Sequence, residues 1–97
     1  MLIIEVMPIK VRLLRPFRDA VGDEEISFRP LSKRLDVEGL ILELCAKYPT
    51  MRAMALNDEE EIDYSVNAIL NGVPVSDIRQ KVKDGDELTL FIPLSGG

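Results

Sequence analysis

The chain has 97 residues, of which 46% are hydrophobic and 30% charged, and its formal net charge is −5. This length predicts a single domain with a modest core, and the composition is typical of a folded, water-soluble protein. With no histidine and one cysteine, Cys45, the sequence excludes Cys/His and Ser/His/Asp nucleophile systems, histidine-based metal sites and an internal disulfide.

The negative charge is concentrated in the second half of the chain. Residues 1–52 hold nine Lys/Arg and eight Asp/Glu, whereas residues 53–97 hold three and nine. Nucleic acid is therefore a poor partner for this surface, and a basic protein is a better one. No apolar run is long enough to cross a bilayer, and the opening MLIIEVM lacks the features of a secretory signal, so we expect a cytoplasmic protein without a membrane partner.

Two strands and one helix are predicted in the first half. Residues 9–14, IKVRLL, alternate between apolar and mostly polar side chains, and a Gly-Asp turn at 22–23 precedes a second strand over 25–29, which predicts a hairpin. Asp36 is a suitable N-cap for a helix over 37–48, whose apolar residues recur at helical spacing until Pro49 ends the run. Cys45 lies near the apolar stripe of this helix and is interpreted as a small buried hydrophobe rather than a redox thiol.

The second half is predicted to contain a connecting segment and three further strands. Residues 52–63 connect the helix to the next strand, and their NDEEEID run is interpreted as exposed loop charge rather than a metal site. A strand over 66–70, an Asn-Gly turn and a short return through 73–75 form a second hairpin. After a turn at 84–86, ELTLFI forms the last strand. This order predicts an α+β fold, a mixed sheet of four to five strands with one main helix across one face, and the last strand beside the first in the centre.

The final residues are predicted to form a flexible tail. Pro93 cannot donate to a sheet ladder, so the last strand should release the chain there, which gives a domain over 1–93 and a tail over 94–97. Gly96 and Gly97 lack a Cβ and could enter a slot that excludes any side chain. The dipeptide alone is as compatible with a frayed terminus as with a functional tail. Its place directly after a strand and Pro93 favours the functional tail.

The ending KVKDGDELTLFIPLSGG resembles that of the MoaD/ThiS sulfur carriers, which have the ubiquitin-like β-grasp fold, and it is most similar to MoaD-type members. Their pattern is a DGDEV turn, an apolar strand and a FPPVSGG-type tail. The layout from Ile9 onward fits this family, whereas residues 1–7 lie outside the resemblance and Met7 is a possible natural start. Ile92-Pro93 stands where the family often has Pro-Pro, which allows the strand to run one residue longer.

The resemblance implies a carrier rather than an enzyme. A MoeB-like, E1-like activating enzyme would use ATP to adenylate the Gly97 carboxylate, and sulfur transfer would convert the adenylate to a thiocarboxylate. AMP and the thiocarboxylate sulfur would thus be held covalently at Gly97 as intermediates. No bound cofactor or metal is expected. Gly96, Ser95 and Leu94 would enter a MoaE-like large subunit of molybdopterin synthase, which uses the sulfur for the molybdopterin dithiolene in molybdenum cofactor biosynthesis. The open alternatives are thiamine thiazole synthesis, tRNA thiolation, protein conjugation, or an interaction module without terminal chemistry.

The sheet face opposite the core is the predicted docking surface for these partners. Leu88, Leu90 and Ile92 are assigned to the core, so Thr89 and Phe91 should face away from it. We expect Leu14 and Val75 on the same outer side as Phe91, with Arg18 as a polar rim contact. The alternatives are that Phe91 packs under a loop or in the core and that Arg18 is a solvated charge.

Overall fold

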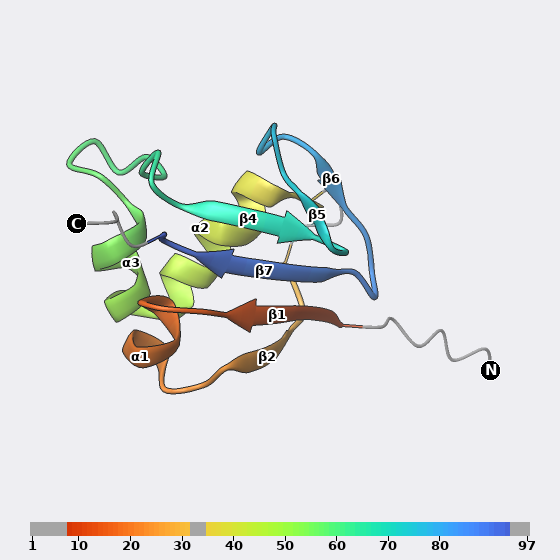
Figure 1. Cartoon of the computed structure of the whole chain (residues 1–97), viewed down its shortest axis with the longest axis horizontal. Helices are drawn as coiled ribbons and strands as arrows, with labels where there is room; N and C mark the ends of the chain where they lie inside the picture. The colour runs from red at the N-terminus through yellow and green to blue at the C-terminus, as the bar shows by residue number, and fades with distance from the viewer. Residues whose placement is uncertain (1–7, 32–34, 94–97) are drawn as a thin grey trace.

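The computed structural model of the protein describes residues 8–31 and 35–93. Its elements in chain order are β1 (Ile9–Leu13), α1 (Phe17–Val21), β2 (Glu25–Phe28), β3 (Leu35–Asp36), α2 (Val37–Lys47), α3 (Pro49–Ala55), β4 (Asn67–Leu70), β5 (Val73–Pro74), β6 (Lys81–Val82) and β7 (Glu87–Phe91). Five strands form one sheet in the order β2-β1-β7-β4-β5, and β3 pairs with β6 in a second, two-stranded sheet. Figure 1 looks onto the main sheet, with α2 behind it and α3 at its left end.

The centre of the main sheet is the pair β1 and β7. These two strands run parallel, with Val11 opposite Leu88 and Leu13 opposite Leu90. β2 pairs antiparallel with β1 on one side, and β4 pairs antiparallel with β7 on the other. The predicted first hairpin and the predicted place of the last strand beside the first are both confirmed. All four of these β1 and β7 side chains are fully buried, so each strand turns an apolar face to the core, whereas Lys10 and Arg12 on the other face of β1 are exposed.

Helix α2 begins and ends close to the predicted positions. The Asp36 side chain accepts a hydrogen bond from the Gly39 N–H at 2.7 Å, which satisfies one of the unpaired donors of the first turn. A Cβ on Gly39 would lie 3.1 Å from Asp36 Oδ1, so the absence of a side chain there leaves room for the cap. The buried residues of α2 face the sheet: Val37, Leu40, Ile41, Leu44 and Cys45.

Two helices and one strand pair differ from the sequence prediction. The link between β1 and β2 contains α1, which buries Phe17, and Gly22 ends this helix at φ 90°. Pro49 does end the α2 run, but it also occupies the first turn of α3, where its missing N–H is not needed. The predicted connection over 52–63 is therefore helical up to Ala55. The sequence prediction also omits β3 and β6, because strands of two residues carry no periodic signal.

The turn predicted at Asn71-Gly72 is confirmed. Both residues have positive φ, 51° and 83°, as a two-residue hairpin turn between β4 and β5 requires. Gly85 likewise has φ 82° in the turn before β7. Within residues 8–31 and 35–93, no helix is long and apolar enough to span a membrane. The tail predicted over 94–97 lies outside the described residues, as do residues 1–7.

Candidate functional site

The chain leaves the main sheet at the end of its central strand. The Leu14 N–H donates to the Leu90 carbonyl at 3.0 Å, and the Ile92 N–H donates to the Arg15 carbonyl at 3.3 Å. β7 itself ends at Phe91, and Pro93, which has no N–H, is exposed. The strand thus ends just before Pro93, as predicted, with one further hydrogen bond at Ile92. The next four residues, which include Gly96 and Gly97, lie outside the described part of the chain.

The register of β7 separates a core face from an outer face. Leu88 and Leu90 are fully buried, and Ile92 is partly buried against the same core, as predicted. Thr89 and Phe91 alternate with them and therefore point to the other side of the sheet, where both are half-buried. No described helix covers this outer face, which is turned toward the viewer in Figure 1.

An apolar patch lies on this outer face next to the end of β7. In the register, Thr89 faces Ile69 of β4, Ile69 faces Pro74 of β5, and Phe91 faces Asn67. Leu14 directly follows β1 in the position beside Phe91, and 36% of its surface is exposed. We refer to Leu14, Ile69, Pro74, Thr89 and Phe91 as the outer-face patch. Sequence reasoning omitted Ile69 and Pro74 because Val75 was the one residue of the second hairpin that it assigned to a face.

The predicted place of Val75 on this face is wrong. The Val75 N–H donates to the Ala68 carbonyl at 2.9 Å, and Ala68 faces Leu90, a core residue. Val75 is accordingly half-buried against the hydrophobic core, and Pro74 occupies the outer position beside Ile69. The two-residue Asn-Gly turn determines this register, and a change of one position would reverse the face.

Charged residues border the patch on the side of β1 and β2. Arg12 lies between Thr89 and Glu25 in the register, and Lys10 Nζ lies 3.5 Å from Glu25 Oε1. Arg18 lies on α1, with its Nε 3.7 Å from Asp19 Oδ1. This local ion pair neither supports nor contradicts the predicted rim contact, which stays a prediction.

The acidic segment after α3 is an ordered turn. Asn57 Oδ1 accepts hydrogen bonds from the N–H groups of Glu59 and Glu61, at 2.9 and 3.1 Å, and Arg52 forms an ion pair with Glu60. Among the described residues, no group of three or more Cys, Asp or Glu side chains is arranged to hold a metal ion. These contacts stabilise the loop without creating a ligand site.

Within residues 8–31 and 35–93, two titratable groups have displaced pKa values. Burial raises the pKa of the Cys45 thiol, and the nearby Arg52 charge lowers it by less. Cys45 is 2% exposed, so its interpretation as a buried hydrophobe is confirmed. The Ser65 hydroxyl and N–H donate to Asp63 Oδ1 at 2.6 and 2.9 Å, and they lower the pKa of that carboxyl. Neither group lies in the outer-face patch.

Comparisons with known proteins agree with this topology. No protein-family model matches the chain, and no curated protein sequence matches it. SAMP1 from Haloferax volcanii superposes with a TM-score of 0.82 at 22% identity, over 92% of this chain and 98% of that one. The fold is the ubiquitin-like β-grasp.

Two further β-grasp structures are more similar in sequence. Small archaeal modifier protein 1 from Methanosarcina acetivorans has a TM-score of 0.75 and 26% identity, over 96% of this chain and 99% of that one. A putative molybdopterin converting factor, subunit 1, from Pyrococcus furiosus has a TM-score of 0.72 and 26% identity, over 91% and 99%. The structural neighbours are thus small ubiquitin-like carrier or modifier proteins, and MoaD is not singled out among them.

Proposed function

We propose that this protein is a cytoplasmic ubiquitin-like carrier whose Gly97 carboxylate is activated by a partner enzyme. The observation that supports it is the placement of the Gly-Gly segment. It follows the central strand of the sheet, four residues after the last ladder hydrogen bond at Ile92, and a partly exposed apolar patch lies beside the exit. A partner can therefore bind the outer-face patch while the slender segment enters its active site.

A carboxylate is a poor electrophile, so the Gly97 carboxylate would have to be activated before it could accept sulfur. An E1-like enzyme would let a Gly97 oxygen attack the α-phosphorus of ATP, releasing pyrophosphate and leaving an acyl-adenylate. A persulfide sulfur from a donor would then displace AMP, and reduction of the resulting acyl disulfide by a thiol would release the thiocarboxylate. ATP and the catalytic side chains belong to the partners, so this chain acts as a carrier and not as an enzyme.

Within this class, we propose a role as the small subunit of a molybdopterin synthase. The DGDELTLFIPLSGG ending and the similarity to the Pyrococcus furiosus protein, named as a putative molybdopterin converting factor subunit, support it. The tail formed by Leu94, Ser95, Gly96 and Gly97 would then deliver its sulfur inside a MoaE-like subunit. A second candidate, protein conjugation, is supported by the equal identity to the small archaeal modifier protein of Methanosarcina acetivorans.

Mass spectrometry of the terminal peptide tests the carrier chemistry. After incubation of the full chain with a MoeB-like enzyme, ATP and a sulfur donor, we expect replacement of one oxygen by sulfur at Gly97. Deletion of Gly97 should abolish the product without changing thermal unfolding, whereas Ser95→Ala, which keeps the tail slender, should retain it. An unchanged mass with every activating enzyme tried would refute the proposal.

Two further measurements separate the candidates. Co-purification of a MoaE-like subunit, and formation of molybdopterin from its precursor by the thiocarboxylated complex, would support the synthase role. Branched peptides that join Gly97 to lysine side chains of other proteins would support conjugation instead. Thiocarboxylate without either result would leave the thiamine and tRNA thiolation pathways as the next to test.

A further inference from the structure

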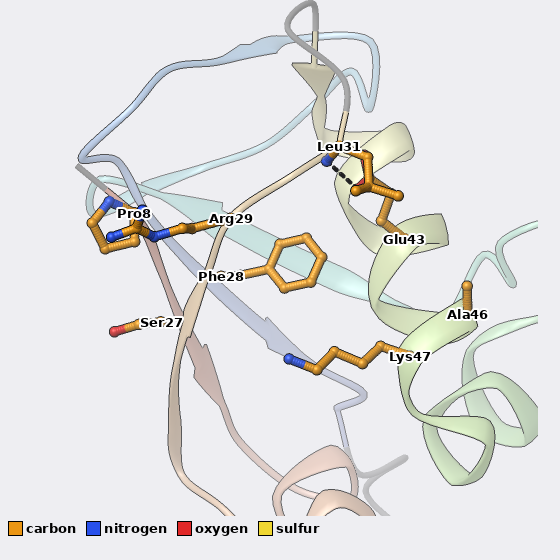
Figure 2. Close-up of a pocket in the computed structure, with 8 residues that line it drawn as sticks. All are labelled: Pro8, Ser27, Phe28, Arg29, Leu31, Glu43, Ala46 and Lys47. Carbon is orange, nitrogen blue, oxygen red and sulfur yellow. Dashed lines mark hydrogen bonds between the residues drawn. The ribbon is translucent and has the colours of Figure 1, made fainter. Parts of the chain in front are cut away.

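A second surface lies away from the tail, between strand β2 and helix α2. A groove of about 650 Å³ opens there, lined by Pro8, Ser27, Phe28, Arg29, Leu31, Glu43, Ala46 and Lys47. Figure 2 shows the Phe28 ring and the Lys47 side chain extending into the space between the strand and the helix. Phe28 pairs with Ile9 at the start of β1, whereas the tail leaves beyond Leu90, at the other end of the sheet. The groove is therefore separate from the outer-face patch.

One wall of the groove is an unpaired strand edge. β2 is the outermost strand and pairs with β1 alone within the described part of the chain. The Leu13 N–H donates to the Glu24 carbonyl, so these two residues form a hydrogen-bonded pair. In an antiparallel ladder every second pair is hydrogen-bonded. Ile26 and Phe28 therefore direct their N–H and C=O groups at β1, and Ser27 directs its groups outward. Such an edge can pair with another extended segment.

The rest of the described lining combines apolar side chains with two cations, Lys47 and Arg29. The Phe28 ring forms part of its floor, Ala46 is exposed on the helix side, and Leu31 is 94% exposed. Lys47 Nζ lies 5.8 Å from the centre of the Phe28 ring, and no carboxylate of the described residues lies within ion-pair distance of it. Among the described residues of the lining, the one acid is Glu43, whose Oε1 already accepts the Leu31 N–H at 2.7 Å.

We propose that this groove binds an extended acidic segment of a partner protein, which adds to β2 as a further strand. Backbone hydrogen bonds to the free edge would provide affinity, alternate apolar side chains would fill the groove over Phe28, and a carboxylate would pair with Lys47 or Arg29. A second copy pairing through its own β2 would leave the groove empty, because Ile26 and Phe28 are already buried in their own core. The carrier could thus be bound by one protein while another engages its tail.

The test uses the full chain, labelled with nitrogen-15, and a defined synthetic peptide. In this peptide valines alternate with threonines between pairs of aspartates, and both ends are blocked. We expect saturable shifts of the Ser27 and Lys47 amide resonances and slower hydrogen exchange at Ser27. Replacing a central threonine with proline removes a ladder donor and should weaken binding by on the order of tenfold.

Matched variants assign the binding to the groove. Ala46→Arg should block it and weaken binding by about tenfold or more, whereas Ala53→Arg, the same change at an exposed position of α3, should leave it unchanged. Lys47→Glu should reverse the preference between the aspartate-flanked peptide and a lysine-flanked version. This reversal cannot result from a general loss of structure, and deletion of Gly97 should not alter it.

Three results would overturn the inference. The first is the absence of saturable shifts at millimolar peptide, and the second is a set of shifts confined to the outer-face patch. The third is strong exchange protection of Ser27 before any peptide is added. That protection would show that another part of the chain or a second copy already occupies the edge.

Discussion

Leu90 and Phe91 are neighbours on β7 with opposite environments, and their alanine variants should separate folding from docking. Leu90 is fully buried between β1 and β4, whereas Phe91 is half-buried on the outer face opposite Asn67. We therefore expect Leu90→Ala to reduce stability strongly and to leave the outer-face patch intact. Phe91→Ala should do the reverse.

The expected magnitudes follow from these environments. Truncating a fully buried leucine costs about 2–5 kcal/mol, and each kcal/mol lowers the Tm of a domain of this size by roughly 4–8 °C. Leu90→Ala should thus lower Tm by at least about 8 °C. Phe91→Ala removes a partly exposed ring and should cost no more than about 1.5 kcal/mol of stability. If Phe91 is a central docking residue, its loss should weaken partner binding by about 2 kcal/mol, roughly thirtyfold.

Both quantities can be measured on the same protein samples. Circular dichroism gives Tm, and isothermal titration with a MoeB-like activating enzyme or a MoaE-like subunit gives Kd at a temperature where both variants are folded. Equal loss of Tm in the two variants would contradict the assignment of Phe91 to the outer face. Unchanged affinity of Phe91→Ala for both partners would refute its docking role, while leaving the assignment of faces intact.

The remaining predictions concern a helix cap, the thiol and a turn carboxylate. Asp36→Ala removes the acceptor for the Gly39 N–H and should cost about 1 kcal/mol, measured by urea unfolding. Cys45, buried and with a raised pKa, should react with a thiol reagent on the order of 100-fold more slowly in the folded than in the unfolded protein. The hydrogen bonds from Ser65 lower the pKa of Asp63 from its ordinary value of 3.8. The ionised carboxylate therefore stabilises the folded state at pH values above 3.8, and this stabilisation is lost as the pH falls through the pKa of the folded protein. Asp63→Asn should therefore flatten the decrease of Tm between about pH 4 and pH 2; an unchanged slope would contradict this.

The features that sequence reasoning predicted are those with a local cause. The Asp36 cap depends on a donor three residues away, and the Asn71-Gly72 turn depends on the positive φ that these two residues tolerate. Helix α3 was missed although Pro49 and the buried pair Met51 and Ala55, four residues apart, are compatible with a short helix. One pair of apolar residues is too short a pattern to predict a helix from the sequence. The packing of these two side chains against other elements stabilises the helix in the folded protein.

The error at Val75 has a different origin. Whether a strand residue faces the core or the outside depends on the pairing register, which joins segments far apart in sequence. The alternation within one strand shows which of its residues share a face. It does not show which of these two sets lies on the same side of the sheet as a given residue of the neighbouring strand. Leu14 could be placed beside Phe91 because the parallel β1 and β7 pair is strongly apolar, whereas the short return strand carried no such signal.

The sequence by itself determined the alternating strands, the capped helix, the Asn-Gly turn and the Gly-Gly segment after Pro93, because each depends on the conformational preferences of a few adjacent residues. Only the tertiary structure decided that Ile69 and Pro74 join Phe91 on one face and that β2 and α2 enclose a groove beside a free strand edge. Surfaces of this kind arise from register and packing between distant segments. Local preferences do not specify them, and it is there that the proposed partners would bind.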